Sequence, residues 1–270
     1  WFLDVMDGGW IEPSSGDHRG ADTIDYQQPY QAVGLDPSIP WYTCLGNHDE
    51  NWMGVNYPTQ KLRDGMVSDQ VLNIGSNLLA TDNAEATGVY VGVVDGTTEY
   101  GVVTSWGAEA DFPTPPTVAA DDRRHCIASP ASRIGEWVDM FFTSPSLPRG
   151  HGLDPSRTGN TQACYSFRPN ANVPLKVIVL DDTCKSTSAP GDLAYNGSGW
   201  IDEERLSWLT GELQQGQNAG ELMIIACHIP INPQADLDDT SKQPQFHPAS
   251  YRSDAELIDF LRNYPNLILL

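Results

Sequence analysis

The chain has 270 residues, 36 acidic against 15 basic side chains, and a formal net charge of −21 at pH 7. This balance argues against nucleic acid as a main partner, because contacts to a phosphate backbone rely on Lys and Arg. An apolar fraction of 40% and 8 Trp are typical of a folded globular protein, and no apolar run approaches the roughly 18 residues that a membrane-spanning helix needs.

The first predicted elements are short. The apolar residues 1–6 precede Asp7-Gly8-Gly9 and predict the tail of a helix. Residues 11–38 are rich in Gly, Pro, Ser and Asp, which indicates a loop. The apolar run of residues 39–45 ends at Gly46 and predicts a strand that is covered on both faces.

The middle of the chain has a different pattern. Residues 89–94 and 100–104 flank Asp95-Gly96-Thr97 and predict a hairpin. Ser132 can cap a helix with an apolar face formed by Ile134, Trp137, Val138 and Phe141. We interpret residues 51–170 as an insertion or elaborated loop region rather than a separate domain.

The last hundred residues alternate between strand and helix. Residues 175–180, 222–227 and 267–270 are short aliphatic runs and predict buried strands. Between them, one helix is predicted from the cap Asp202 to Gly216, with Leu206, Leu209 and Leu213 on one face. A capping box at 253–256 predicts a second helix that ends before Pro265. This alternation indicates the α/β class.

The strongest candidate site is Gly46-Asn47-His48-Asp49-Glu50, directly after the predicted strand 39–45. Strand ends are where open α/β sheets build ligand sites, and Gly46 allows a sharp turn there. Asn47 can offer an amide oxygen to a hard cation. His48 can give a proton at neutral pH, and Asp49 can orient it by accepting its other N–H. The alternative is a polar turn, in which these residue types are common.

A second histidine follows a later strand. His228-Ile229-Pro230 comes after the run 222–227. A lone His at a strand end is more often a core or rim residue than a ligand, but Asn47 needs a partner to bind a metal. Asp181 and Asp182 also end a predicted strand and can line the site, although acids there are often plain caps.

These motifs resemble a known family. G-N-H-D at one strand end and H-x-P at a later one resemble the third and fourth blocks of the calcineurin-like metallophosphoesterases. Residues 199–209, an acidic turn before a helix with a Trp-Leu pair, are similar to the stretch before that family's metal-binding His. Residues 1–55 resemble an uncharacterised prokaryotic branch. The resemblance covers most of the chain and is weak between 56 and 160.

The resemblance implies a four-layer α/β/β/α sandwich, as a single domain over residues 1–270 with an insertion at about 51–170. It implies hydrolysis of a phosphomonoester or phosphodiester by a dinuclear centre of two divalent ions, Mn, Fe or Zn. Asn47 and His228 would be ligands of one ion. His48 would assist the leaving oxygen or hold the phosphate, with Asp49 behind it. A hydroxide between the two ions would attack phosphorus in line.

The family's other metal-binding blocks, D-x-H, G-D-x-x-D and G-H-x-H, are missing. Gly16-Asp17-His18 lacks the second Asp, and Gly150-His151-Gly152-Leu153 lacks the second His, so we interpret the latter as a loop near the substrate. We therefore expect an internal fragment, incomplete at both ends and inactive alone. The alternative from another class is a non-catalytic acidic binding or structural protein that retains the fold without metals.

The expected partner is a phosphoester small molecule, not nucleic acid or a membrane span. Its attraction to an acidic protein requires bound cations, which would dominate the local field. The five cysteines contain no C-x-x-C, which argues against a zinc ribbon or a thioredoxin-type site. Cys44 and Cys227 end apolar runs and are interpreted as small buried hydrophobic residues. The compartment stays open between exported and cytoplasmic.

Overall fold

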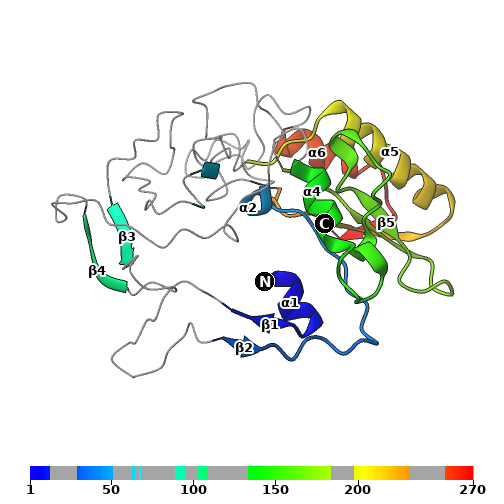
Figure 1. The fold of residues 1–270 in the computed structure, drawn as a ribbon. Helices are drawn as coiled ribbons and strands as arrows, with labels where there is room; N and C mark the ends of the chain where they lie inside the picture. Colours follow the sequence, from blue (N-terminus) through cyan, green and yellow to red (C-terminus); the bar gives the residue numbers. More distant parts are fainter. Residues whose placement is uncertain are drawn as a thin grey trace. The chain divides into compact units, whose positions relative to one another are not determined.

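The structure is a computed structural model that describes residues 1–12, 29–50, 63–64, 67, 89–94, 103–108, 133–183, 198–231 and 253–269. The chain divides into two compact units, one of residues 1–39 with 58–132 and one of residues 40–57 with 133–270 (Figure 1). Both candidate motifs, G-N-H-D and H-x-P, belong to the second unit. The prediction of a single domain with an insertion at about 51–170 stays a prediction.

The first unit begins with helix α1 (Phe2–Asp7), which confirms a helix at residues 1–6. It ends at Gly8, whose φ of 79° lies in the left-handed region that glycine adopts most readily. Strand β1 (Trp10–Ile11) then pairs antiparallel with β2 (Tyr30–Gln31), so the predicted loop of residues 11–38 contains part of a small β-ribbon.

The predicted hairpin of the first unit is confirmed. Strand β3 (Val89–Val94) pairs antiparallel with β4 (Val103–Ala108). The second strand begins at Val103 rather than at Tyr100. The predicted turn Asp95-Gly96-Thr97 lies outside the described residues.

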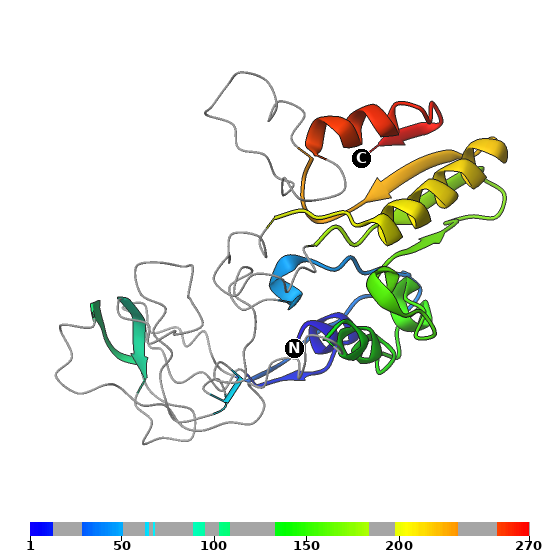
Figure 2. The same ribbon diagram turned by 90° about the horizontal axis from the view of Figure 1, so that it is seen from above.

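The second unit is built on a mixed sheet with the order β5-β6-β7-β8 (Figure 2). Its strands are β5 (Tyr165–Phe167), β6 (Leu175–Val179), β7 (Leu222–Ala226) and β8 (Leu267–Leu269). Strands β6, β7 and β8 are parallel, and β5 is antiparallel to β6. The three strands predicted in the last hundred residues are therefore confirmed, and the chain belongs to the α/β class.

Two helices connect the parallel strands, α5 (Glu203–Asn218) and α6 (Asp254–Leu261). Their predicted caps are confirmed: Asp202 accepts a hydrogen bond from the amide of Arg205, and Ser253 and Glu256 form a capping box. One core cluster contains the predicted apolar face of α5 together with residues of α6 and the sheet, among them Ile178, Leu206, Leu209, Leu213, Met223, Ile225, Leu257 and Leu261. None of the described helices is both long and apolar enough to cross a membrane.

Gly216 does not end α5 as predicted, because the helix continues to Asn218. A Cβ at Gly216 would lie 2.4 Å from the sulfur of Met223. The glycine therefore serves the close packing of α5 on β7, and the chain leaves the helix further on, where Gly220 has a φ of 69°.

The strand predicted at residues 39–45 is wrong, since the structure assigns no strand to residues 39–46. The segment is held by a loop instead. The amide of Trp41 donates to the carbonyl of Leu147 at 3.1 Å, and the amide of Thr43 donates to that of His151 at 3.2 Å. The amides of Trp41 and Thr43 are thus hydrogen-bonded at every second residue, as in a strand. Their partners, however, lie in the 3₁₀ helix η3 (Arg149–Gly152) and in the turn before it, not in a neighbouring strand.

Helix α4 (Arg133–Phe141) confirms the helix predicted after Ser132, and its Trp137, Val138 and Phe141 are buried. The helix contacts both η3 and α2 (Asn47–Glu50). Residues 133–170, which lie inside the predicted insertion, therefore help to build the unit that carries the candidate motifs.

Candidate functional site

The structure brings together the two predicted metal ligands, Asn47 and His228. Asn47 is the first residue of α2, and His228 follows β7 after Cys227. The side-chain oxygen of Asn47 and Nε2 of His228 are 2.8 Å apart, although 181 positions separate the residues. The two strand-end and helix-start motifs therefore meet in the fold.

Gly46 allows this contact because it has no side chain. A Cβ at Gly46 would lie 3.0 Å from three ring atoms of His228. The backbone of Gly46 is not among those with positive φ, so the predicted sharp turn does not use the left-handed conformation and stays a prediction. The role that the structure shows is close approach of an imidazole ring to the backbone.

His48 and Asp49 are both exposed on α2. Asp49 accepts a hydrogen bond from the amide of Gly46 at 2.8 Å, and its own amide donates to the Gly46 carbonyl at 3.0 Å. These contacts fix the first turn of α2, and the alternative of a polar turn stays open. Among the described residues Asp49 makes no hydrogen bond to His48, so its orienting role stays a prediction.

Asp181, Asp182 and Thr183 follow β6 at the same edge of the sheet as His228, because β6 and β7 are parallel. All three are fully buried. Asp182 accepts hydrogen bonds from the amides of His228 and Ile229 at 3.1–3.2 Å. The two aspartates therefore do not line an open site, as we considered, but lie behind it.

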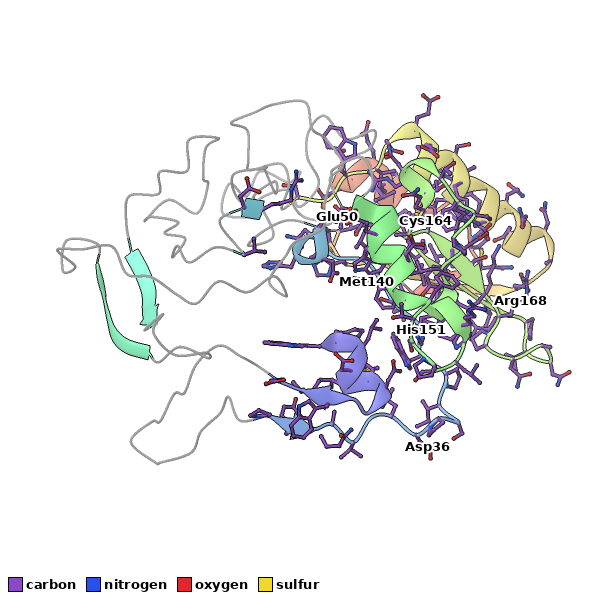
Figure 3. All side chains as sticks on the ribbon, in the orientation of Figure 1. Asp36, Glu50, Met140, His151, Cys164 and Arg168 are labelled. Atoms are coloured by element: carbon purple, nitrogen blue, oxygen red, sulfur yellow. The ribbon has the colours of Figure 1, made fainter. Side chains whose placement is uncertain are left out.

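Glu50 connects α2 to the same buried segment (Figure 3). Its carboxylate lies 3.1 Å from the hydroxyl of Thr183, which also lies 2.7 Å from Asp181. The hydroxyl has one proton and can donate to only one of these carboxylates at a time. Glu50 is only 3% exposed, so its contact with Thr183 is shielded from water.

Arg205 is a residue of this network that sequence reasoning missed. It is fully buried, and its Nη1 donates to the carbonyls of Asp181 at 2.9 Å and Thr183 at 2.8 Å. Its Nε donates to the carboxylate of Asp202 at 2.9 Å. The signal in the sequence is an arginine four residues before the buried Leu209, on the apolar face of α5, where a charge needs fixed partners.

Burial sets the electrostatics of this region. It raises the pKa of Asp182 to about 7, and the neighbouring Asp181 adds to the rise while the amides of Ile229 and His228 oppose it. Burial also raises the pKa of Cys44 to about 12 and raises that of Cys227. Both thiols therefore favour the protonated form at neutral pH, and both side chains are partly buried rather than buried as predicted.

The 2.8 Å separation of Asn47 and His228 is that of a hydrogen bond, in which Nε2 of His228 donates to the amide oxygen. Within the described part of the chain, no group of three His, Cys, Asp or Glu side chains could hold a metal. The predicted role of Asn47 and His228 as metal ligands stays a prediction.

His151 is a structural residue. It is fully buried, its ring nitrogens lie 3.1 Å from the Trp41 carbonyl and 2.9 Å from the Ser144 hydroxyl, and its ring stacks on Trp41 at 3.4 Å (Figure 3). The interpretation of its loop as one near the substrate stays a prediction. His18 lies outside the described residues.

Comparisons with protein-family models, with curated proteins and with solved structures give no match to this chain.

Proposed function

We propose that this chain is part of a metal-dependent phosphoester hydrolase of the calcineurin-like metallophosphoesterase type, which acts on a phosphomonoester or a phosphodiester. The observation that supports the proposal is the 2.8 Å approach of the Asn47 oxygen to Nε2 of His228. The sequence motifs alone predicted both residues, which lie 181 positions apart in the chain.

The four-layer α/β/β/α sandwich is part of the same proposal. The described sheet β5-β6-β7-β8 with α5 and α6 packed on it would be one sheet-and-helix half. The remaining metal ligands would come from residues outside the described ranges or from sequence beyond these 270 residues.

Each site residue has a distinct task in this proposal. Asn47 and His228 hold one cation, and His48, exposed next to Asn47, donates a proton to the leaving oxygen or binds the phosphate. When bound, a pair of divalent ions supplies a nucleophile at neutral pH and stabilises the charge on the phosphoryl oxygens. Bound cations would also offset the net charge of −21, which by itself repels an anionic substrate.

The test is hydrolysis of aryl phosphate monoesters and diesters by the protein as its cells make it, in the wild type and in His48→Ala. The variant should lose a factor of about 10²–10⁴ in rate, as expected for a lost general acid, and keep its metal content. The exchange Arg262→Ala, at a surface ion pair of α6, is the control and should leave the rate unchanged.

A His48→Ala variant with full activity on a substrate that has a poor leaving group would remove His48 from the mechanism. A wild-type protein with neither bound metal nor hydrolysis would favour the alternative, a non-catalytic acidic binding or structural protein.

A further inference from the structure

The buried segment Asp181–Thr183 contacts both halves of the candidate site. It consists of two carboxylates and a hydroxyl that are all fully buried, which is costly unless each group is hydrogen-bonded. Apolar residues at the end of β6 would avoid this cost. The bonds that the segment makes to its neighbours therefore indicate what it is for.

One contact is made to the loop that carries His228. Asp182 accepts from two successive amides, at 3.2 Å from His228 and at 3.2 Å and 3.1 Å from Ile229. A carboxylate bonded to two adjacent amides fixes the direction in which the chain leaves β7. It thereby fixes the point from which the imidazole of His228 projects.

The other contact is made to the helix that carries Asn47. Thr183 Oγ1 lies 3.1 Å from a carboxylate oxygen of Glu50. Glu50 is three residues after Asn47 in α2, so the two side chains lie on one face of the helix, one turn apart. A bond at Glu50 therefore controls how α2 is rotated and where the Asn47 amide points.

The segment itself is held rigidly. The Nη1 atom of Arg205 bonds to the carbonyls of Asp181 and Thr183, on both sides of Asp182. The other end of this guanidinium is bonded to Asp202, which also caps α5. The segment is thus tied to a helix of the core, and both candidate loops are tied to the segment.

We propose that Asp182 and Thr183 are positioning residues that set the distance between the Asn47 oxygen and Nε2 of His228. Their meaning for catalysis rests on the proposed function, because metal ligands must be placed to within about 0.2 Å. The positioning itself does not depend on a metal and can be measured without one.

The first measurement uses the protein as its cells make it, freed of metal, and its variants Thr183→Val and Asp182→Asn. Thr183→Val removes the hydroxyl at nearly constant volume. Nitrogen NMR should show the His228 ring released from Asn47 in this variant. Asp182→Asn should increase hydrogen exchange at the His228 and Ile229 amides by about tenfold or more, as expected for a lost charge-assisted bond.

Two controls separate positioning from a general loss of structure. Thr183→Ser keeps the hydroxyl and should restore the wild-type signals of His228. Thr210→Val removes a hydroxyl that, among the described residues, bonds the Leu206 carbonyl within α5 at 2.7 Å, and should leave those signals unchanged. If Thr183→Val does not fold, Glu50→Ala removes the same contact from the α2 side and takes its place.

The second measurement is a Zn²⁺ titration of the same proteins. Residues that position ligands typically change metal affinity by about 10–100-fold, so Thr183→Val should bind Zn²⁺ that much more weakly and Thr210→Val should bind as the wild type does. If the His228 signals change but the wild type binds no Zn²⁺, the positioning inference stands and the proposed function fails. If Thr183→Val keeps the wild-type His228 signals, the positioning inference is overturned whatever the Zn²⁺ result.

Discussion

At the scale of single residues, the candidate site depends on groups whose roles differ from their appearance in the sequence. The motif predicted which side chains would meet, Asn47 and His228. It did not predict that Gly46 makes room for the imidazole ring of His228. A glycine after an apolar run can serve either a turn or a close contact, and the sequence does not distinguish the two. The role of Asp182 was equally hidden, because its partners are backbone amides 46 and 47 residues away.

Gly46→Ala tests the role of the missing side chain. The added methyl would lie 3.0 Å from the His228 ring, so the ring must shift by a few tenths of an ångström. We expect the Asn47–His228 hydrogen bond to be lost and the free energy of unfolding to fall by about 1–3 kcal/mol, as for other overpacked sites. Nitrogen NMR of His228 and chemical denaturation measure the two effects.

The control is Gly135→Ala in α4, where an added Cβ meets nothing within 4 Å. It should stabilise the protein by up to about 1 kcal/mol through helix propensity. An equal change in the free energy of unfolding in Gly46→Ala and Gly135→Ala would refute the explanation given for Gly46.

At the scale of elements, the sequence predicted what depends on local patterns and not what depends on distant partners. The caps at Asp202 and Ser253, the apolar face of α5 and the three parallel strands were all predictable from neighbouring residues. The segment 39–45 was not, because an apolar run indicates an extended buried chain without naming its backbone partner. That partner is the turn and 3₁₀ helix around residues 147–151, a hundred residues later.

Two glycines of α5 allow a matched comparison of packing and propensity. An added Cβ at Gly211 meets nothing within 4 Å, whereas at Gly216 it would lie 2.4 Å from the sulfur of the buried Met223. Gly211→Ala should therefore raise the free energy of unfolding by about 0.5–1 kcal/mol. Gly216→Ala should lower it by about 1–3 kcal/mol, because the core must make room. Stabilisation by both exchanges in chemical denaturation would show that Gly216 is not required for packing.

The ion pair of Glu212 on α5 with Lys176 on β6 predicts that the free energy of unfolding depends on pH. Burial works to raise the pKa of Glu212, but hydrogen bonds from Lys176 and Ser166 outweigh it and hold the pKa below its usual 4.5. A lowered pKa means that the folded state favours the ionised form. The resulting stabilisation is present above about pH 4.5 and is lost as the pH falls through the lowered value.

Glu212→Gln should remove this dependence. At pH 7 it should reduce the free energy of unfolding by about 2 kcal/mol, since the nearly buried Lys176 loses its counter-ion. The difference between variant and wild type should shrink as the pH is lowered below 4.5. A difference that stays constant between pH 7 and pH 3 in chemical denaturation would contradict this account of the pair.

At the scale of the whole molecule, the net charge and the small number of metal-ligand atoms both bear on how the proposed site would hold cations. A net charge of −21 repels an anionic phosphoester, and cations bound at the proposed site would offset this repulsion. The described residues bring two ligand atoms to one point, and no group of three metal-binding His, Cys, Asp or Glu side chains is found among them. Two ligands, one of them a neutral amide, cannot hold two divalent ions against their mutual repulsion. The account therefore requires further ligands from elsewhere in the protein.

The most direct test of the central claim is elemental analysis of the protein isolated as its cells make it, with His228→Ala measured beside the wild type. If the proposed function holds, we expect about two divalent ions per chain in the wild type, as in two-metal hydrolases. In His228→Ala we expect about one, because the ion that His228 shares with Asn47 loses a ligand. A metal-free wild type, or a variant that keeps both ions, would contradict the claim that Asn47 and His228 bind one metal of a pair.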